Sequence, residues 1–211
     1  MESAIQIAIY IHAFFGGIGL VTGLGSVFVQ KGSKLHTNMG KLFSVGMLGS
    51  SLISMPIAVL PNHENLFLFL IALFTIYLVL VGNRAVTFKT KEKANTIDYV
   101  LSGAMFSCSL VMLVFGIFGM IQEVSMSILY VIFGSFGLLL TVRDYMFYKN
   151  FKQKKNSWLV AHLSKMIGAL IASITAFIVA GLGSASLIAW LLPSVLGTIY
   201  IIYYKRKILK A

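Results

Sequence analysis

The chain is 211 residues long, with 58% hydrophobic and 11% charged residues, whereas a soluble domain has about 45–50% apolar and about 25% charged residues. Its formal net charge is +11, because 17 Lys and Arg residues outnumber six Asp and Glu residues. This composition excludes an ordinary soluble domain. The cations are spread over short segments between apolar runs, so we expect them to face anionic lipid headgroups and no nucleic acid.

Seven apolar stretches follow one another along the chain. A run of about 18 or more apolar residues with few or no charges is typical of a membrane-spanning helix. We therefore predict an all-α, polytopic membrane protein that forms a single seven-helix transmembrane domain over residues 1–211. The predicted helices cover residues 4–29, 41–60, 66–88, 97–122, 126–148, 158–182 and 187–204.

The Lys and Arg residues fall on one side of this frame. Fourteen of the 17 lie in or directly next to the segments 30–40, 89–96 and 149–156, or in the tail after residue 204, and the alternate segments hold none. The other three, Arg84, Arg143 and Lys165, lie inside predicted helices but toward the same ends. Cytoplasmic loops of membrane proteins carry an excess of Lys and Arg. This pattern predicts an N-terminus outside, a C-terminus in the cytoplasm, and anionic headgroups of the cytoplasmic leaflet as partners of the basic segments.

The first predicted helix carries Gly16, Gly19 and Gly23 on the same face as His12. Small residues allow two helix backbones to approach closely in lipid, where dispersion and polar contacts must supply the attraction. This face is predicted to pack against another helix, either within the chain, in a partner protein or in a second copy of a homo-oligomer.

His12 is the first residue with a charged or imidazole side chain inside a predicted span. Ionisable groups within the membrane are costly and are functional candidates by default. The alternatives for His12 are a hydrogen bond to a carbonyl or hydroxyl of a neighbouring helix, a proton relay, a haem ligand or a contact with a substrate.

A second polar group is predicted where helices end on the cytoplasmic side, with His36 in the adjoining loop. Its members at similar depth are Asn83, Arg84, Arg143, Asp144, His162 and Lys165. One interpretation is interfacial anchoring combined with a topology signal. The other is an anion site open to the cytoplasm, in which Arg84, Arg143 and Lys165 bind phosphate or carboxylate.

The four histidines suggest a further alternative. Two imidazoles on facing helices at one depth can hold a haem, and His36 with His162 is the better candidate pair for haem b, with His12 as a further candidate. A metal ion shared by His36 and His162 is a weaker hypothesis, because two ligands make an incomplete site.

Two segments carry a family resemblance. The first runs from His12 through Gly19-Leu-Val-Thr-Gly23 to Lys31-Gly32-Ser33-Lys34-Leu35-His36-Thr37-Asn38-Met39-Gly40-Lys41, and the second comprises His162-Leu-Ser-Lys-Met166-Ile-Gly168 and Thr175-Ala176-Phe177. They resemble a family of bacterial multi-pass membrane proteins of unknown function, which has a histidine in its first helix and a basic-Gly-x-x-x-His turn. The resemblance implies a bacterial cytoplasmic membrane location and marks His12, His36, Arg143 and His162 for testing.

Together these observations favour a membrane protein that binds or transports a small molecule or anion at a polar, basic site in its cytoplasmic half. A membrane redox protein that holds haem b is the alternative. A third hypothesis is a non-catalytic subunit or assembly factor, whose glycine-rich faces dock partner helices.

Overall fold

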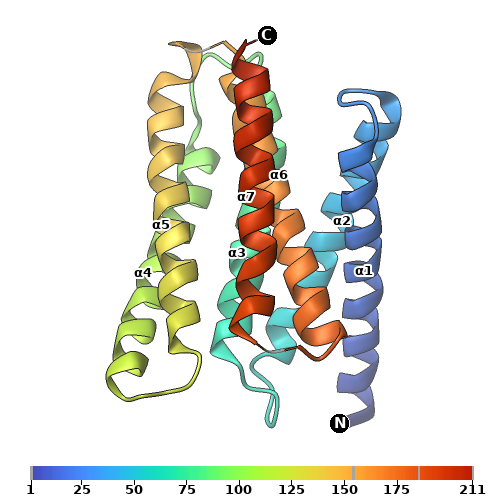
Figure 1. The fold of residues 1–211 in the computed structure, drawn as a ribbon, viewed down its shortest axis with the longest axis vertical. Helices are drawn as coiled ribbons and strands as arrows, with labels where there is room; N and C mark the ends of the chain where they lie inside the picture. Colours follow the sequence, from blue (N-terminus) through green and yellow to red (C-terminus); the bar gives the residue numbers. More distant parts are fainter. Residues whose placement is uncertain (1, 154, 185, 211) are drawn as a thin grey trace. The chain divides into compact units, whose positions relative to one another are not determined.

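The computed structural model describes residues 2–153, 155–184 and 186–210, and over these residues it is all-helical, with seven α-helices (Figure 1). A 3₁₀ turn at Phe151–Gln153 follows the fifth helix, and a π-helical turn at Phe177–Gly181 continues the sixth. Lys154 and Ala185 belong to two of the predicted loops and lie outside the described residues. The helices are α1 (Glu2–Phe28), α2 (Lys34–Ile57), α3 (Leu66–Thr87), α4 (Thr96–Ile121), α5 (Ser127–Asn150), α6 (Ser157–Ala176) and α7 (Leu187–Lys210).

Within the described residues, six helices are long and apolar enough to cross a membrane, and α2 is not among them. The first turns of α2 carry Lys34, His36 and Lys41, and its remainder is rich in serine and glycine, which lowers its hydropathy. The chain therefore has the helical and apolar character of a membrane protein. Its most polar helix is the one between α1 and α3.

α2 also begins earlier than the sequence predicts. We expected a loop over residues 30–40, but the helix begins at Lys34, so His36 lies in its first turn and not in a loop. The reason is a cap: the Ser33 side chain accepts a hydrogen bond from the His36 backbone N–H at 3.1 Å. Ser33 thereby satisfies one of the backbone donors that a helix start leaves without an intrahelical partner.

The described residues form two compact units. The first contains the chain up to Val79 together with residues 166–200. The second contains residues 80–165 and the end of α7 from Ile201.

In the first unit α1 and α2 lie side by side along a glycine-lined contact (Figure 1). A Cβ placed on Gly46 of α2 would lie 2.7 Å from the backbone nitrogen of Gly19 and 2.8 Å from the carbonyl oxygen of Phe15. Gly23 of α1 is equally enclosed, by Phe43 and Leu170. The predicted packing of the α1 glycine face is confirmed, because backbone of α1 meets backbone of α2 where no side chain fits.

The rest of the first unit is held together by larger apolar side chains. Phe67 of α3 meets Trp190 of α7 edge to face, with ring centroids 5.3 Å apart. Leu78 and Val79 are almost fully buried. Side chains of this kind supply the area of contact that the small residues between α1 and α2 do not.

In the second unit α4 and α5 form an antiparallel pair joined by a tight turn (Figure 1). Gly134 and Gly137 of α5 face Ser109 of α4, with the Cβ position of Gly134 3.0 Å from the Ser109 carbonyl oxygen. Near the other ends of these helices, Phe88, Tyr148 and Phe151 form a buried aromatic cluster. Phe88 and Tyr148 stack with an interplanar angle of 11°.

Candidate functional site

A buried ion pair lies within the second unit. The Lys165 Nζ of α6 is 2.9 Å from Oδ1 of Asp144 on α5 and donates a hydrogen bond to its Oδ2 at 3.0 Å. Lys165 is only 3% exposed and Asp144 5%. Because neither charge reaches water, each depends on its partner for the solvation it has lost.

Two hydroxyl groups extend this pair. Ser102 of α4 donates a hydrogen bond to Asp144 Oδ2 at 3.1 Å, and the Tyr148 hydroxyl lies 2.9 Å from the same Ser102 oxygen. Since the single hydroxyl hydrogen of Ser102 is directed to Asp144, Tyr148 donates to Ser102. A chain of hydrogen bonds therefore leads from the Tyr148 hydroxyl through Ser102 to the Asp144 carboxylate. Lys165 of α6 contacts the same carboxylate.

A second charged cluster involves the other aspartate of the chain. Asp98, in the first turn of α4, accepts hydrogen bonds from Arg84 Nε at 2.6 Å and from Lys91 Nζ at 3.0 Å. It also accepts the Asn95 backbone N–H at 2.9 Å, and Arg84 donates to the Asn95 side-chain oxygen at 2.7 Å. Asp98 thus caps α4 and fastens the end of α3 to it.

Helical spacing explains why the two clusters adjoin. Asp98 and Ser102 are four residues apart on α4, and Asp144 and Tyr148 are four residues apart on α5, so each pair lies on one helix face. Ser102 belongs to the face of Asp98 and contacts Asp144. The two faces therefore bring both aspartates of the sequence into one polar region, which we call the polar network.

The polar network has a small excess of positive charge. Its cations are Arg84, Lys91 and Lys165, and its carboxylates are Asp98 and Asp144, which leaves one positive charge. Both aspartates of the 211-residue sequence belong to it. Two cations of the predicted anion site, Arg84 and Lys165, are therefore already paired with carboxylates of the chain itself.

His162 lies one turn before Lys165 on α6. Its Nδ1 is 2.8 Å from the carbonyl oxygen of Gly82 on α3. A carbonyl oxygen can only accept, so Nδ1 carries the hydrogen. With Lys165, His162 fastens the start of α6 to both α3 and α5.

The remaining predicted residues of this unit are exposed. Arg143 is exposed although it adjoins Asp144 in sequence, because successive residues of a helix point about a quarter-turn apart. Asn83 is exposed as well, next to Arg84. The structure thus brings together Arg84, Asp144, His162 and Lys165 from the predicted set.

His12 and His36 belong to the first unit. His12 Nδ1 is 2.9 Å from both the carbonyl oxygen and the hydroxyl oxygen of Ser50, across the contact between α1 and α2. His36 Nδ1 is 3.1 Å from the carbonyl oxygen of Ser26. The helix-to-helix hydrogen bond proposed for His12 is present. The pairing of His36 with His162 remains a prediction, because the two residues belong to different units.

Sequence reasoning missed several members of the network, namely Lys91, Asn95, Asp98, Ser102 and Tyr148. A signal for three of them was present in the sequence. Asp98 and Asp144 are the two aspartates of a chain poor in acidic residues, and each has a hydroxyl residue four positions later. The described residues contain no group of three or more His, Cys, Asp and Glu side chains able to hold a metal ion.

Comparison of the chain with protein-family models, with curated proteins and with solved structures gives no match.

Proposed function

We propose that the chain is a multi-pass protein of the bacterial cytoplasmic membrane, with seven spans, N-terminus outside and C-terminus inside, and that it binds or transports a small anion through the polar network. Six apolar helices in the described residues support the membrane location. The placement of Lys and Arg in alternate segments supports the orientation.

The observation that carries the proposal is the buried pair of Lys165 and Asp144. A charged side chain inside a membrane helix is expensive and marks a substrate, ion or proton path by default. Here the cost is met by a second buried charge and by two hydroxyl groups. An apolar packing of the same volume would hold the helices together as well, which favours a role in binding over one in stability.

The chemistry proposed is an exchange of partners on Lys165. Asp144 acts as a tethered carboxylate that an incoming carboxylate or phosphate replaces, while Ser102 and Tyr148 supply hydroxyl donors to whichever anion is present. The extra positive charge of the network, together with the exposed Arg143, attracts anions toward it. Release follows when Asp144 returns to Lys165.

Asp144→Asn tests this exchange, because it keeps the shape of the side chain but leaves Lys165 without its carboxylate. The purified variant is unfolded thermally in acetate, phosphate, sulfate or chloride at constant ionic strength. A bound anion at about ten times its dissociation constant adds about 1.4 kcal/mol, which raises the Tm of a chain of this size by about 3–6 °C. We expect this anion-dependent rise in Asp144→Asn, with a smaller rise in the unaltered protein.

Glu92→Gln is the matched control, because it removes the same charge from an exposed loop position. It should respond to anions as the unaltered protein does. The double variant Asp144→Asn with Lys165→Met, which retains no buried charge at the pair, should lose the response. Equal responses in Asp144→Asn and Glu92→Gln would contradict the proposal.

Haem b binding is the second candidate. The observation in its favour is that His12, His36 and His162 each direct Nδ1 to a backbone carbonyl, as haem and metal ligands do to present Nε2. An absorbance spectrum of the purified protein separates the candidates. The anion proposal expects no Soret band, and a Soret band lost in His36→Ala or His162→Ala would favour the haem.

A further inference from the structure

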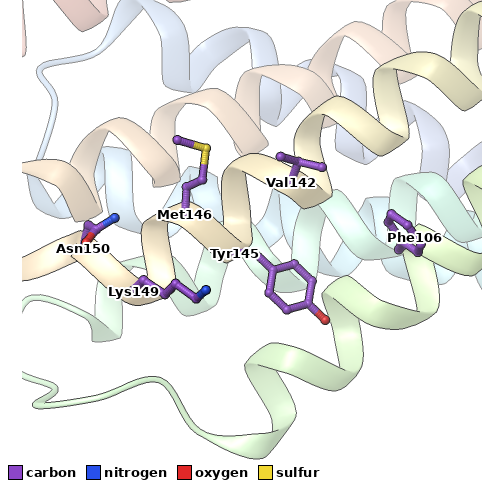
Figure 2. Close-up of a pocket in the computed structure, with 6 residues that line it drawn as sticks. All are labelled: Phe106, Val142, Tyr145, Met146, Lys149 and Asn150. Atoms are coloured by element: carbon purple, nitrogen blue, oxygen red, sulfur yellow. The ribbon is translucent and has the colours of Figure 1, made fainter.

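The second unit has a surface pocket that the polar network does not use. It has a volume of about 370 Å³ and is formed by α4 and α5 (Figure 2). Its lining is mostly apolar and all of it is exposed. The lining residues are Phe106, Val142, Tyr145, Met146, Lys149 and Asn150.

The pocket has two chemically different ends. Phe106 of α4 with Val142 and Met146 of α5 provides hydrocarbon and ring surface, whereas Lys149 and Asn150 provide an amine and an amide in the last turn of α5. In Figure 2 the amine of Lys149 extends along α5 toward Tyr145. An occupant must therefore be apolar over most of its length and polar, with negative charge, at one end.

The neighbourhood of Lys149 strengthens the charge argument. Residues 149–156 hold Lys149, Lys152, Lys154 and Lys155 and no Asp or Glu. The salt bridges of the described residues join Asp98 to Arg84 and Lys91 and Asp144 to Lys165, and Lys149 is in none of them. The positive charge at this end of the pocket is thus available to an anion from outside the chain.

Two tyrosines mark the level at which apolar and polar lining meet. The Tyr145 ring of the pocket lies 5.9 Å from the Tyr99 ring, centroid to centroid. Tyr99 in turn lines a neighbouring pocket with Lys93, Asn95 and Thr96. Tyrosine is enriched where hydrocarbon meets headgroups, so this pair places Lys149 and Lys93 on the headgroup side.

We propose that this pocket is a binding site for one anionic phospholipid. Its acyl chain lies over Phe106, Val142 and Met146, and its phosphate contacts Lys149. Basic pockets between membrane helices on the cytoplasmic side are known to bind anionic headgroups. The site needs the membrane location but not the anion exchange at Lys165, so either proposal can fail without the other.

Native mass spectrometry of the full chain in detergent tests the site, with phosphatidylglycerol and phosphatidylcholine of identical acyl chains added in equal amounts. We expect the unaltered protein to retain one phosphatidylglycerol in preference to phosphatidylcholine. Removing one lysine near the headgroup weakens anionic binding about five-fold. Lys149→Gln should therefore reduce the preference by this factor, and the matched charge removal Lys34→Gln, at the exposed start of α2, should leave it unchanged.

A second pair of variants tests the apolar end. Val142→Trp fills the pocket and should abolish retention of both lipids, whereas Val111→Trp, at an exposed α4 position outside the lining, should not. The proposal is overturned if the unaltered protein shows no preference between the two lipids. It is also overturned if Lys149→Gln and Lys34→Gln weaken the preference equally, or if Val142→Trp retains lipid as the unaltered protein does.

Discussion

Neighbouring helices are held together differently in two regions of the molecule. One region is the contact between α1 and α2, and the other is the polar network of the second unit. α1 and α2 approach until backbone touches backbone, with glycine at the crossing and a single histidine-to-serine hydrogen bond beside it. The segments α3 to α6 of the second unit are instead joined through two aspartates and their cations. Close packing needs no charge, so the charges of the second unit call for a reason other than packing.

The largest effect should come from breaking the buried pair. Lys165→Met leaves Asp144 charged, buried and without its cation, and losing one partner of such a pair lowers the free energy of unfolding by about 3–5 kcal/mol. The double variant Asp144→Asn with Lys165→Met removes both charges and should recover most of this loss. Denaturant unfolding in mild detergent measures both. If the single variant lost less than about 1 kcal/mol, Asp144 would have to be solvated by other groups, and the contrast with α1 and α2 would weaken.

A smaller effect is expected at the glycine contact. Gly46→Ala places a methyl group 2.7 Å from the backbone nitrogen of Gly19, and since backbone cannot move aside, the helices must separate at a cost of about 1–3 kcal/mol. Gly40 of the same helix has no atom within 4 Å of its Cβ position. Gly40→Ala should therefore stabilise by about 0.5–1 kcal/mol, the ordinary gain of alanine over glycine in a helix. Thermal unfolding of both variants, followed by circular dichroism, measures the difference, and equal effects would mean that the two helices do not meet at Gly46.

These two regions also differ in how far the sequence predicts them. The helices follow from apolar runs, and the packing of α1 follows from glycine spacing, because both depend on residues near in sequence. The start of α2 was missed because Ser33, a local cap, outweighs the charges that follow it. The network was half predicted: Arg84, Asp144, His162 and Lys165 are polar candidates at the predicted cytoplasmic helix ends, and the burial of Asp144 and Lys165 was not expected. Their partners Asp98 and Ser102 were not identified, since pairing across helices depends on their packing. The family resemblance, the seven spans and the single domain over residues 1–211 remain predictions.

The smallest effect concerns His12, and it decides whether the first unit is only a packing element. A polar contact between membrane helices contributes about 0.6 kcal/mol on average and up to about 1.7 kcal/mol. His12→Leu and Ser50→Ala should each lose about this much, and because they share one hydrogen bond, the double variant should lose less than the sum. Reversible unfolding of the four proteins measures the coupling. His12→Leu is also added to the Asp144→Asn protein. If the added substitution left the stability unchanged but removed the anion-dependent rise in Tm, His12 would act on the ligand and not on the packing of α1 against α2.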